Sequence, residues 1–177
     1  MSDRNLDVLV TRKFGPIGEH LEFESLFDDS PLLVVAGAKS PWARRRRIEL
    51  AELVNERWAL PSPDSGMGSL VMEAFHASGL AYPRTTAVAD FVEGRMNLLA
   101  SGRFLTILPP AVLGFSTGRP RCKVLPVELP SARVSVGIVT LKNRTLSPVA
   151  RLFIEHARGR EAAGEEEGIA PTSGCGP

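Results

Sequence analysis

The sequence contains no uncharged apolar run long enough to cross a bilayer, and its N-terminus, Met1-Ser2-Asp3-Arg4-Asn5, lacks the apolar core of a secretion signal. Its two cysteines, Cys122 and Cys175, lie far apart without the spacing of metal ligands. We therefore expect a cytoplasmic chain with no membrane segment and no metal site. In this interpretation Cys122 is a packing residue and Cys175 belongs to a loose tail.

The sequence also lacks the motifs that carry catalytic chemistry. It has no HExxH motif, no P-loop lysine and no glycine-rich dinucleotide fingerprint after a strand. Ser65 lacks the glycine pattern of a nucleophile turn, and Asp90 with Glu93 is explained better as a helix cap than as a catalytic carboxylate pair. The histidines are scattered and are interpreted as surface or helix-flanking residues: His20, His76 and His156. These absences predict a binding protein that is not an enzyme and has no cofactor.

The composition is that of a globular chain without a dominant charge. Its 177 residues suffice for one ordinary domain or two small lobes, and 44% of them are apolar. A net charge of +1 argues against strong nonspecific electrostatic binding to nucleic acid or to an anionic membrane. The run from Arg44 to Arg47 could contact nucleic acid, but a solvated face beside a short helix is the commoner explanation.

Short apolar runs alternate with helical patterns along the chain, which predicts an α/β fold with largely parallel sheets. We expect strands at residues 6–11, 21–27, 32–36, 57–60, 85–89, 104–108, 123–127 and 134–141. The strand at 123–127 fits a sheet edge because it contains Pro126. Helices are expected to begin near Pro41, Ile48, Met67, Asp90 and Pro148.

The last predicted helix starts at Ser147-Pro148, and we expect three of its apolar residues, Val149, Leu152 and Phe153, to face inward. From Gly159 the composition changes to Glu, Ala, Gly and Ser. Residues 159–177 are therefore predicted to form a disordered tail.

A candidate ligand site lies where the strand that ends at Leu60 runs through a polar turn into the helix from Met67 to Ser78. The first N–H groups of such a helix have no partner within it, and the positive end of the helix dipole favours a carboxylate, a phosphate or a hydroxyl. From the residues alone, a purely structural strand-to-helix connection is the commoner explanation. Ligands of α/β folds do bind at the carboxyl ends of parallel strands, which is where this turn is expected.

The order of these features resembles the C-terminal effector-binding domain of LysR-type transcriptional regulators, from about Leu6 to Arg158. The segments that carry the resemblance are Leu6–Val10, Ser40–Ile48, Glu56–Pro61, Leu98–Gly102, Thr106–Pro109 and Leu146–Pro148. Ser40 to Ala43 and Val139 to Arg144 look closest to a branch that includes galactose-binding-protein regulators. At Gly102-Arg103-Phe104 the chain departs from a Gly-x-Gly that is common in the family.

The resemblance implies a fold like type 2 periplasmic binding proteins, with two α/β lobes joined by two crossovers. Residues 33–130 would form the second lobe, and residues 1–32 and 131–158 a first lobe that is incomplete because its first two strand–helix units are missing. The crossovers would lie near Leu26–Leu33 and Glu128–Val134. The family's helix-turn-helix and linker helix are also missing, so we expect no direct DNA binding by this chain.

The resemblance further implies a small effector, such as a sugar or a small organic acid, in the cleft between the lobes. The positions that match its contacts are Arg12, Ser62, Ser65, Gly66, Met67, Phe91, Val92 and Thr140. Two alternatives remain. The chain could be an interaction module that dimerises with itself or with a full-length regulator, or it could be a gene remnant without function.

Overall fold

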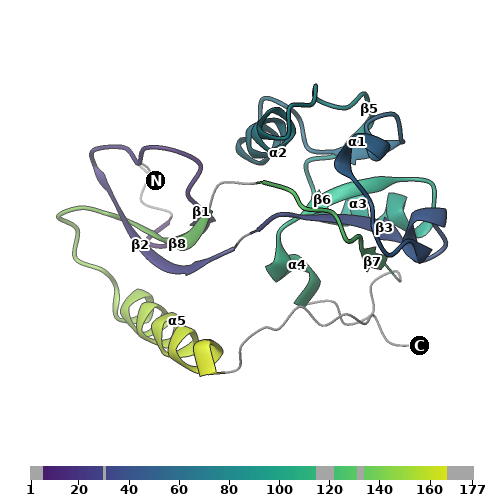
Figure 1. Ribbon diagram of the computed structural model, residues 1–177. Coiled ribbons are helices and arrows are strands. Elements are labelled where there is room, and N and C mark those ends of the chain that lie inside the picture. The colour runs from purple at the N-terminus through teal and green to yellow at the C-terminus, as the bar shows by residue number, and fades with distance from the viewer. Residues whose placement is uncertain (1–5, 30, 115–121, 131–133, 167–177) are drawn as a thin grey trace. The chain divides into compact units, whose positions relative to one another are not determined.

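The computed structural model describes residues 6–29, 31–114, 122–130 and 134–166. The chain divides into two compact units, shown in Figure 1. Among the described residues, unit 1 comprises 6–29 and 134–166, and unit 2 lies within 31–130. The chain therefore passes between the units twice, as a two-lobed fold with two crossovers requires.

Unit 2 is built on a five-stranded mixed sheet in the order β5-β4-β6-β3-β7. Its strands are β3 (Leu33–Gly37), β4 (Trp58–Leu60), β5 (Thr85–Val88), β6 (Leu105–Leu108) and β7 (Cys122–Val124). β4 runs parallel to β5 and β6, whereas β3 runs antiparallel to β6 and β7. The prediction that the strand before Pro126 lies at an edge is confirmed by β7.

Helices cover both faces of this sheet. Alternate residues of a strand point to opposite faces, so each central strand contributes side chains to both packed layers. The helical elements are η1 (Pro41–Arg44), α1 (Leu50–Leu53), α2 (Gly66–Ala77), α3 (Val92–Ala100) and α4 (Pro110–Gly114). On one face Val34 and Ile107 pack with residues of α1 and α2, and there Phe75 meets Trp58 edge to face at 5.6 Å. On the other face Val35 and Leu108 pack with α3.

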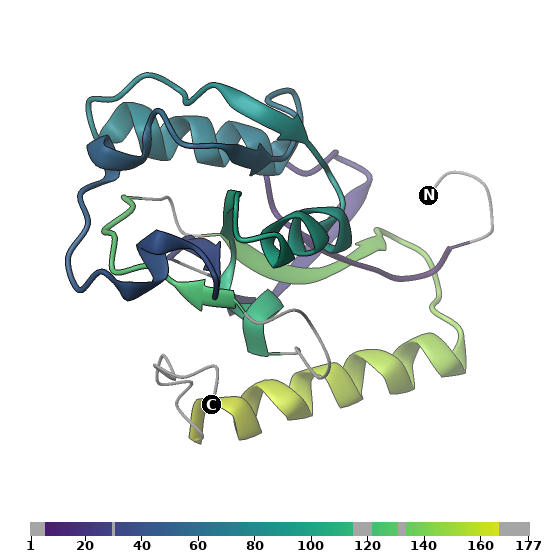
Figure 2. The same cartoon turned by 90° about the vertical axis from the view of Figure 1, so that its right-hand side faces the viewer.

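Unit 1 contains a three-stranded antiparallel sheet in the order β1-β8-β2. Its strands are β1 (Leu9–Arg12), β2 (Leu21–Asp28) and β8 (Ser135–Leu141), and the helix α5 (Pro148–Glu166) follows. α5 is the long yellow-green helix in Figure 2, and Ile154 packs with Leu26 and Ile138 of the sheet. Gly137 cannot carry a side chain, since a Cβ there would lie 2.2 Å from the carbonyl oxygen of Glu24.

Two expectations about unit 1 were wrong. The sheets are not largely parallel, because β8 returns from unit 2 between β1 and β2 and runs against both of them. The inward face of α5 is also different from the expected one: Val149, Leu152 and Phe153 are 77%, 67% and 48% exposed, while Ala150 and Ile154 are buried.

The helix α5 also continues beyond Gly159 to Glu166, where we expected a disordered tail. Its last part is rich in glutamate and alanine, which are good helix formers. The rest of the predicted tail, with Cys175, lies outside the described residues. Cys122 is buried in the cluster that contains Val35 and Leu108, in agreement with its expected packing role.

Candidate functional site

The turn before α2 is held by the hydroxyl of Ser65, which forms the N-cap of the helix. Its Oγ accepts a hydrogen bond from the N–H of Gly68 at 3.0 Å and donates to the carbonyl oxygen of Ser62 at 2.7 Å. A Cβ at Gly68 would lie 1.9 Å from the same carbonyl oxygen, so only glycine fits there. These contacts fix the direction of the first helical N–H groups.

Two backbone donors at this turn are left open. Within the part of the chain that the structure describes, the N–H groups of Gly66 and Met67 have no hydrogen-bond partner. Both residues are half-buried, and they are the first two of a twelve-residue helix. The unpaired donors and the helix dipole can together hold a carboxylate, a phosphate or a hydroxyl.

The neighbouring strand β5 supports the turn through Asp90. Its Oδ1 accepts a hydrogen bond from the N–H of Ser62 at 2.7 Å, and the N–H of Ala89 donates to the carbonyl oxygen of Leu60 at 2.9 Å. The prediction that Asp90 caps the following helix is therefore wrong. The N-cap of α3 is Phe91, with no side-chain cap, because the parallel pairing of β4 and β5 brings Asp90 to Ser62 instead.

The second-lobe candidates thus gather at the carboxyl ends of β4 and β5, where α2 and α3 begin. Phe91 is 81% exposed there, so its ring is available to an apolar part of a ligand. Val92 differs from the others, since its side chain packs against the buried cluster beneath α3. Its side chain therefore supports the site from the core.

In unit 1, Arg12 ends β1 and forms an ion pair with a buried carboxylate. It donates from Nε at 3.0 Å and from Nη2 at 2.6 Å to Oδ2 of Asp29, whose side chain is only 1% exposed. Asp29 also donates its N–H to the carbonyl oxygen of Val134, where the chain returns from unit 2. Arg12 is therefore fixed at the crossover end of unit 1. Asp29 could not be singled out from the sequence, because Asp28-Asp29-Ser30-Pro31 is equally typical of an ordinary turn.

The structure does not bring Thr140 to Arg12. Arg12 pairs with Val136 on β8, whereas Thr140 pairs with Glu22. The separation of four residues along a strand corresponds to about 13 Å. A ligand much shorter than this distance therefore cannot contact both side chains.

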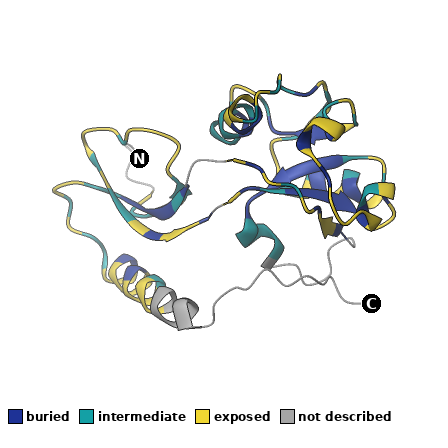
Figure 3. Cartoon of the chain, in the orientation of Figure 1, coloured by how far each residue is buried: buried dark blue, intermediate teal, exposed yellow. Residues whose placement is uncertain are grey.

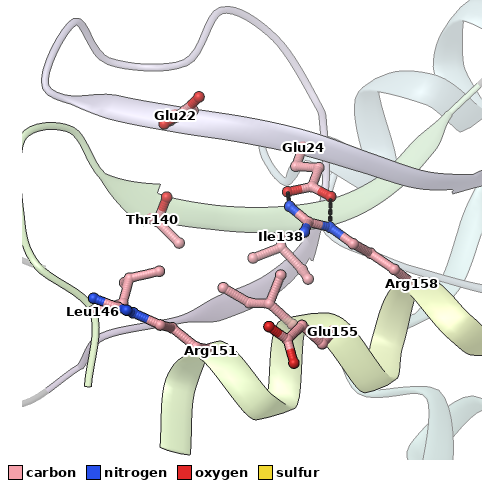
Figure 4. Close-up of a pocket in the computed structure, with 9 residues that line it drawn as sticks. Glu22, Glu24, Ile138, Thr140, Leu146, Arg151, Glu155 and Arg158 are labelled. Atoms are coloured by element: carbon pink, nitrogen blue, oxygen red, sulfur yellow. Dashed lines mark hydrogen bonds and ion pairs between the residues drawn. The ribbon is translucent and has the colours of Figure 1, made fainter. Parts of the chain in front are cut away.

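Thr140 instead lines a pocket of about 390 Å³ between the sheet of unit 1 and α5, shown in Figure 4. Arg158 of α5 forms a two-pronged ion pair there with Glu24 of β2, with Nη2 and Oε2 2.7 Å apart. The hydrogen bonds from Arg158 hold the pKa of Glu24 below its ordinary value. The pocket also has a free cation, since Arg151 has no side-chain partner among the described residues.

None of the helices in 6–29, 31–114, 122–130 and 134–166 is long and apolar enough to span a bilayer. The same ranges hold no group of three or more histidine, cysteine, aspartate or glutamate side chains arranged to bind a metal ion.

Known proteins share both the sequence pattern and the fold. A sequence profile of the family described as LysR substrate binding domain matches residues 1–162. The Hca operon transcriptional activator HcaR of Escherichia coli is 28% identical over 161 residues, which cover 89% of this chain and 52% of HcaR. The transcriptional dual regulator GltC of Bacillus subtilis is 27% identical over 115 residues, covering 65% of this chain and 38% of GltC. The chain thus spans about half, or less, of these relatives.

Solved structures match over most of the chain. The regulatory domain of Synechocystis CcmR, in complex with 2-PG, superimposes with a TM-score of 0.73 at 20% identity and covers 89% of this chain and 74% of that one. The BenM effector binding domain with its effector benzoate gives a TM-score of 0.68 at 19% identity, covering 97% and 76%. About a quarter of each of these domains has no counterpart in this chain.

The profile covers far more than half of the chain, and the fold agrees with it. The resemblance to the galactose-binding-protein branch is not tested by these relatives and stays a prediction. The chain belongs to the LysR substrate-binding domain family and has its two-lobed α/β fold, similar to type 2 periplasmic binding proteins.

Proposed function

We propose that this chain is the effector-binding part of a LysR-type transcriptional regulator and that it binds a small metabolite. The observation that carries the proposal is the pair of unpaired N–H groups at Gly66 and Met67, at the carboxyl edge of β4 and β5. In α/β folds this edge is the usual place for a ligand. The family membership makes a regulatory effector the favoured ligand.

The effector is a small organic acid in this proposal, with a sugar as the less favoured class. Its acid group would accept from the N–H groups of Gly66 and Met67, beside Ser62 and the hydroxyl of Ser65, and its apolar part would lie against Phe91. Solved neighbours carry shikimate and benzoate, which are both carboxylates. Carboxylates are favoured at a helix N-terminus because of the dipole and the unpaired donors.

Arg12 is proposed as the effector contact of unit 1, and Val92 as a residue that supports the site from the core. The ion pair with Asp29 uses Nε and Nη2 of Arg12, so Nη1 is left to bind a second acceptor. A fixed guanidinium is suited to a carboxylate because little side-chain entropy is lost on binding. Thr140 lies too far along β8 to share that ligand, and any contact it makes would belong to the pocket beneath α5.

The test uses two substitutions at Ser65 that both preserve the helix cap. Aspartate and asparagine are good N-cap residues, so neither variant should lose much stability. The charge of Ser65→Asp would repel a carboxylate at the open N–H groups, whereas Ser65→Asn would not. We expect binding of benzoate or shikimate, measured by calorimetry, to fall at least tenfold more in Ser65→Asp than in Ser65→Asn. Equal affinities in the two variants would contradict the site.

We also propose that this chain works in the cytoplasm, is not an enzyme and does not bind DNA by itself. Its relatives are transcriptional regulators, and the family profile over residues 1–162 describes a substrate-binding domain. A gel-shift assay with the upstream region of the gene checks the last point. A sequence-specific shift by this chain alone would refute it.

A second candidate function is association with a full-length regulator or with a second copy of this chain. The apolar side chains that α5 leaves exposed, Val149, Leu152 and Phe153, favour this candidate, because exposed apolar clusters commonly mark protein interfaces. Light scattering after size exclusion measures self-association. The variant Leu152→Glu should shift any dimer toward monomer without lowering stability.

A further inference from the structure

A second cavity, of about 460 Å³, lies in unit 2 at the amino ends of β4 and β6. It is therefore at the opposite end of these strands from Ser62 and Gly66. Trp42 of η1 lines it, together with Arg57, which precedes β4, and Arg103, which precedes β6. The proposed effector site uses none of these residues. We refer to this cavity as the arginine pocket.

The backbone brings the two arginines together. β4 and β6 are parallel neighbours with Trp58 opposite Leu105, and the N–H of Leu105 donates to the carbonyl oxygen of Arg57 at 2.9 Å. Neither guanidinium has a hydrogen-bond or ion-pair partner among the described residues. Each guanidinium is a planar fork of donors that suits a phosphate, and both groups line the same cavity.

The charge around the arginine pocket is positive overall. Two arginines and one acid, Glu56, line it. The arginine run that follows Trp42 in the sequence contains Arg44, Arg46 and Arg47, which are exposed but do not line the cavity. Arg45 is the exception in that run. It is paired with Glu52 at 3.0 Å and lies 5.6 Å from the centre of the Trp42 ring. A doubly charged anion gains more than a carboxylate from this surplus of positive charge.

Part of the wall of the arginine pocket is apolar, since Pro41, Trp42 and Leu105 line it. Trp42 is half-buried, and Leu105 is 2% exposed. Gly102 also lines the cavity, at a φ of +72° that L side chains rarely adopt, and a Cβ there would lie 3.0 Å from the Cβ of Lys39, so this loop conformation favours glycine. An apolar group attached to the phosphate could therefore lie against Trp42.

From these observations we infer that the arginine pocket binds a small organic phosphate, with the phosphate on Arg57 and Arg103 and the organic part against Trp42. The site is separate from the proposed effector site and needs no change in it. The bound anion would also neutralise an uncompensated positive cluster that is otherwise exposed to solvent.

The binding test uses phenyl phosphate as the probe and the intrinsic tryptophan fluorescence of the chain as the reporter of binding. The chain has two tryptophans, and Trp58 is fully buried, so a change in fluorescence on titration reports chiefly on Trp42. We expect saturable binding that is tighter for phenyl phosphate than for inorganic phosphate, and much weaker for benzoate. A response that does not saturate at millimolar phenyl phosphate would overturn the proposal.

Four variants assign the contacts. Arg57→Gln and Arg103→Gln should each weaken phenyl phosphate binding about tenfold, since each removes one charged donor. Glu56→Gln should strengthen it several-fold, because the only acid that lines the described pocket is lost. Arg151→Gln, which removes the same charge from unit 1, should leave the affinity unchanged.

The other possible results of these four variants would contradict the proposal. Unchanged affinity in both pocket variants, or a loss in Arg151→Gln alone, would place the phosphate elsewhere and overturn the proposal. Because the side chains of Arg57 and Arg103 are exposed, these variants should fold, and circular dichroism checks that they do. Ser65→Asp should still bind phenyl phosphate, so failure of the effector site and failure of this one are distinguishable.

Discussion

The two units contain similar elements but very different cores. In unit 2 both faces of the sheet are covered, and its central strands are almost entirely buried, as the dark blue ribbon of Figure 3 shows. In unit 1 one small buried cluster joins α5 to the sheet. Two large apolar side chains of that sheet, Val10 on β1 and Phe27 on β2, are 47% and 45% exposed. Since apolar burial is the main stabilising contribution, we conclude that unit 2 carries most of the stability of the chain.

Core truncations should show this difference most strongly. Phe75 is fully buried against Trp58, so Phe75→Ala should lower the free energy of unfolding by about 3–5 kcal/mol. Ile154→Ala, in the smaller cluster of unit 1, should cost about 2 kcal/mol. Urea unfolding followed by circular dichroism measures both. Equal losses would mean that unit 1 is as well packed as unit 2.

Removing the ion pair of Arg12 should have an intermediate effect. Arg12→Gln leaves the buried carboxylate of Asp29 without its guanidinium partner and should cost about 1–3 kcal/mol. The matched control is Arg144→Gln, which removes a 3.3 Å ion pair with Asp7 in which both side chains are 33% exposed. Exposed pairs contribute little, so a loss of less than about 1 kcal/mol is expected there. A control as costly as Arg12→Gln would refute the special role of Asp29.

The exposed pair of Glu24 and Arg158 should give the smallest effect, visible only through its pH dependence. The hydrogen bonds of Arg158 lower the pKa of Glu24 in the folded state. A carboxyl group of this kind stabilises the fold above its unfolded pKa and loses that contribution as the pH falls through the folded value. Glu24→Gln should therefore lower the melting temperature slightly at pH 7, and the difference should vanish in acid. A difference that persists below the folded pKa of Glu24 would contradict this origin.

The sequence was most informative where local patterns decide the structure. A strand was expected at Leu32 to Ala36, and the fully apolar run is typical of a strand covered on both faces, as β3 is. The turn before α2 was also recognisable, because Ser65 can form the cap and Gly66 follows it. The helix start and its open N–H groups follow from neighbours in the sequence.

Contacts between distant residues could not be predicted in this way. Helical periodicity did not decide which side of α5 packs, since Val149 with Leu152 and Ala150 with Ile154 both form apolar stripes. Asp90 looked like a helix cap, but its partner Ser62 lies 28 residues away. Arg57 and Arg103 line the same cavity because β4 and β6 are neighbours in the sheet. This strand order cannot be predicted from a local sequence pattern.

The order of strands in unit 1 also has a consequence for biosynthesis. β1 and β2 leave the ribosome before β8 but do not pair with each other, since β8 lies between them. Ser135 of β8 donates to Asp28 of β2, a residue 107 positions earlier. The strands of unit 2 lie entirely between these segments, so that unit can fold while the chain is still growing. Until β8 emerges, the nascent chain therefore carries β1 and β2 without the strand that pairs with both of them in the described structure. During that time they are exposed to chaperones, proteases and aggregation.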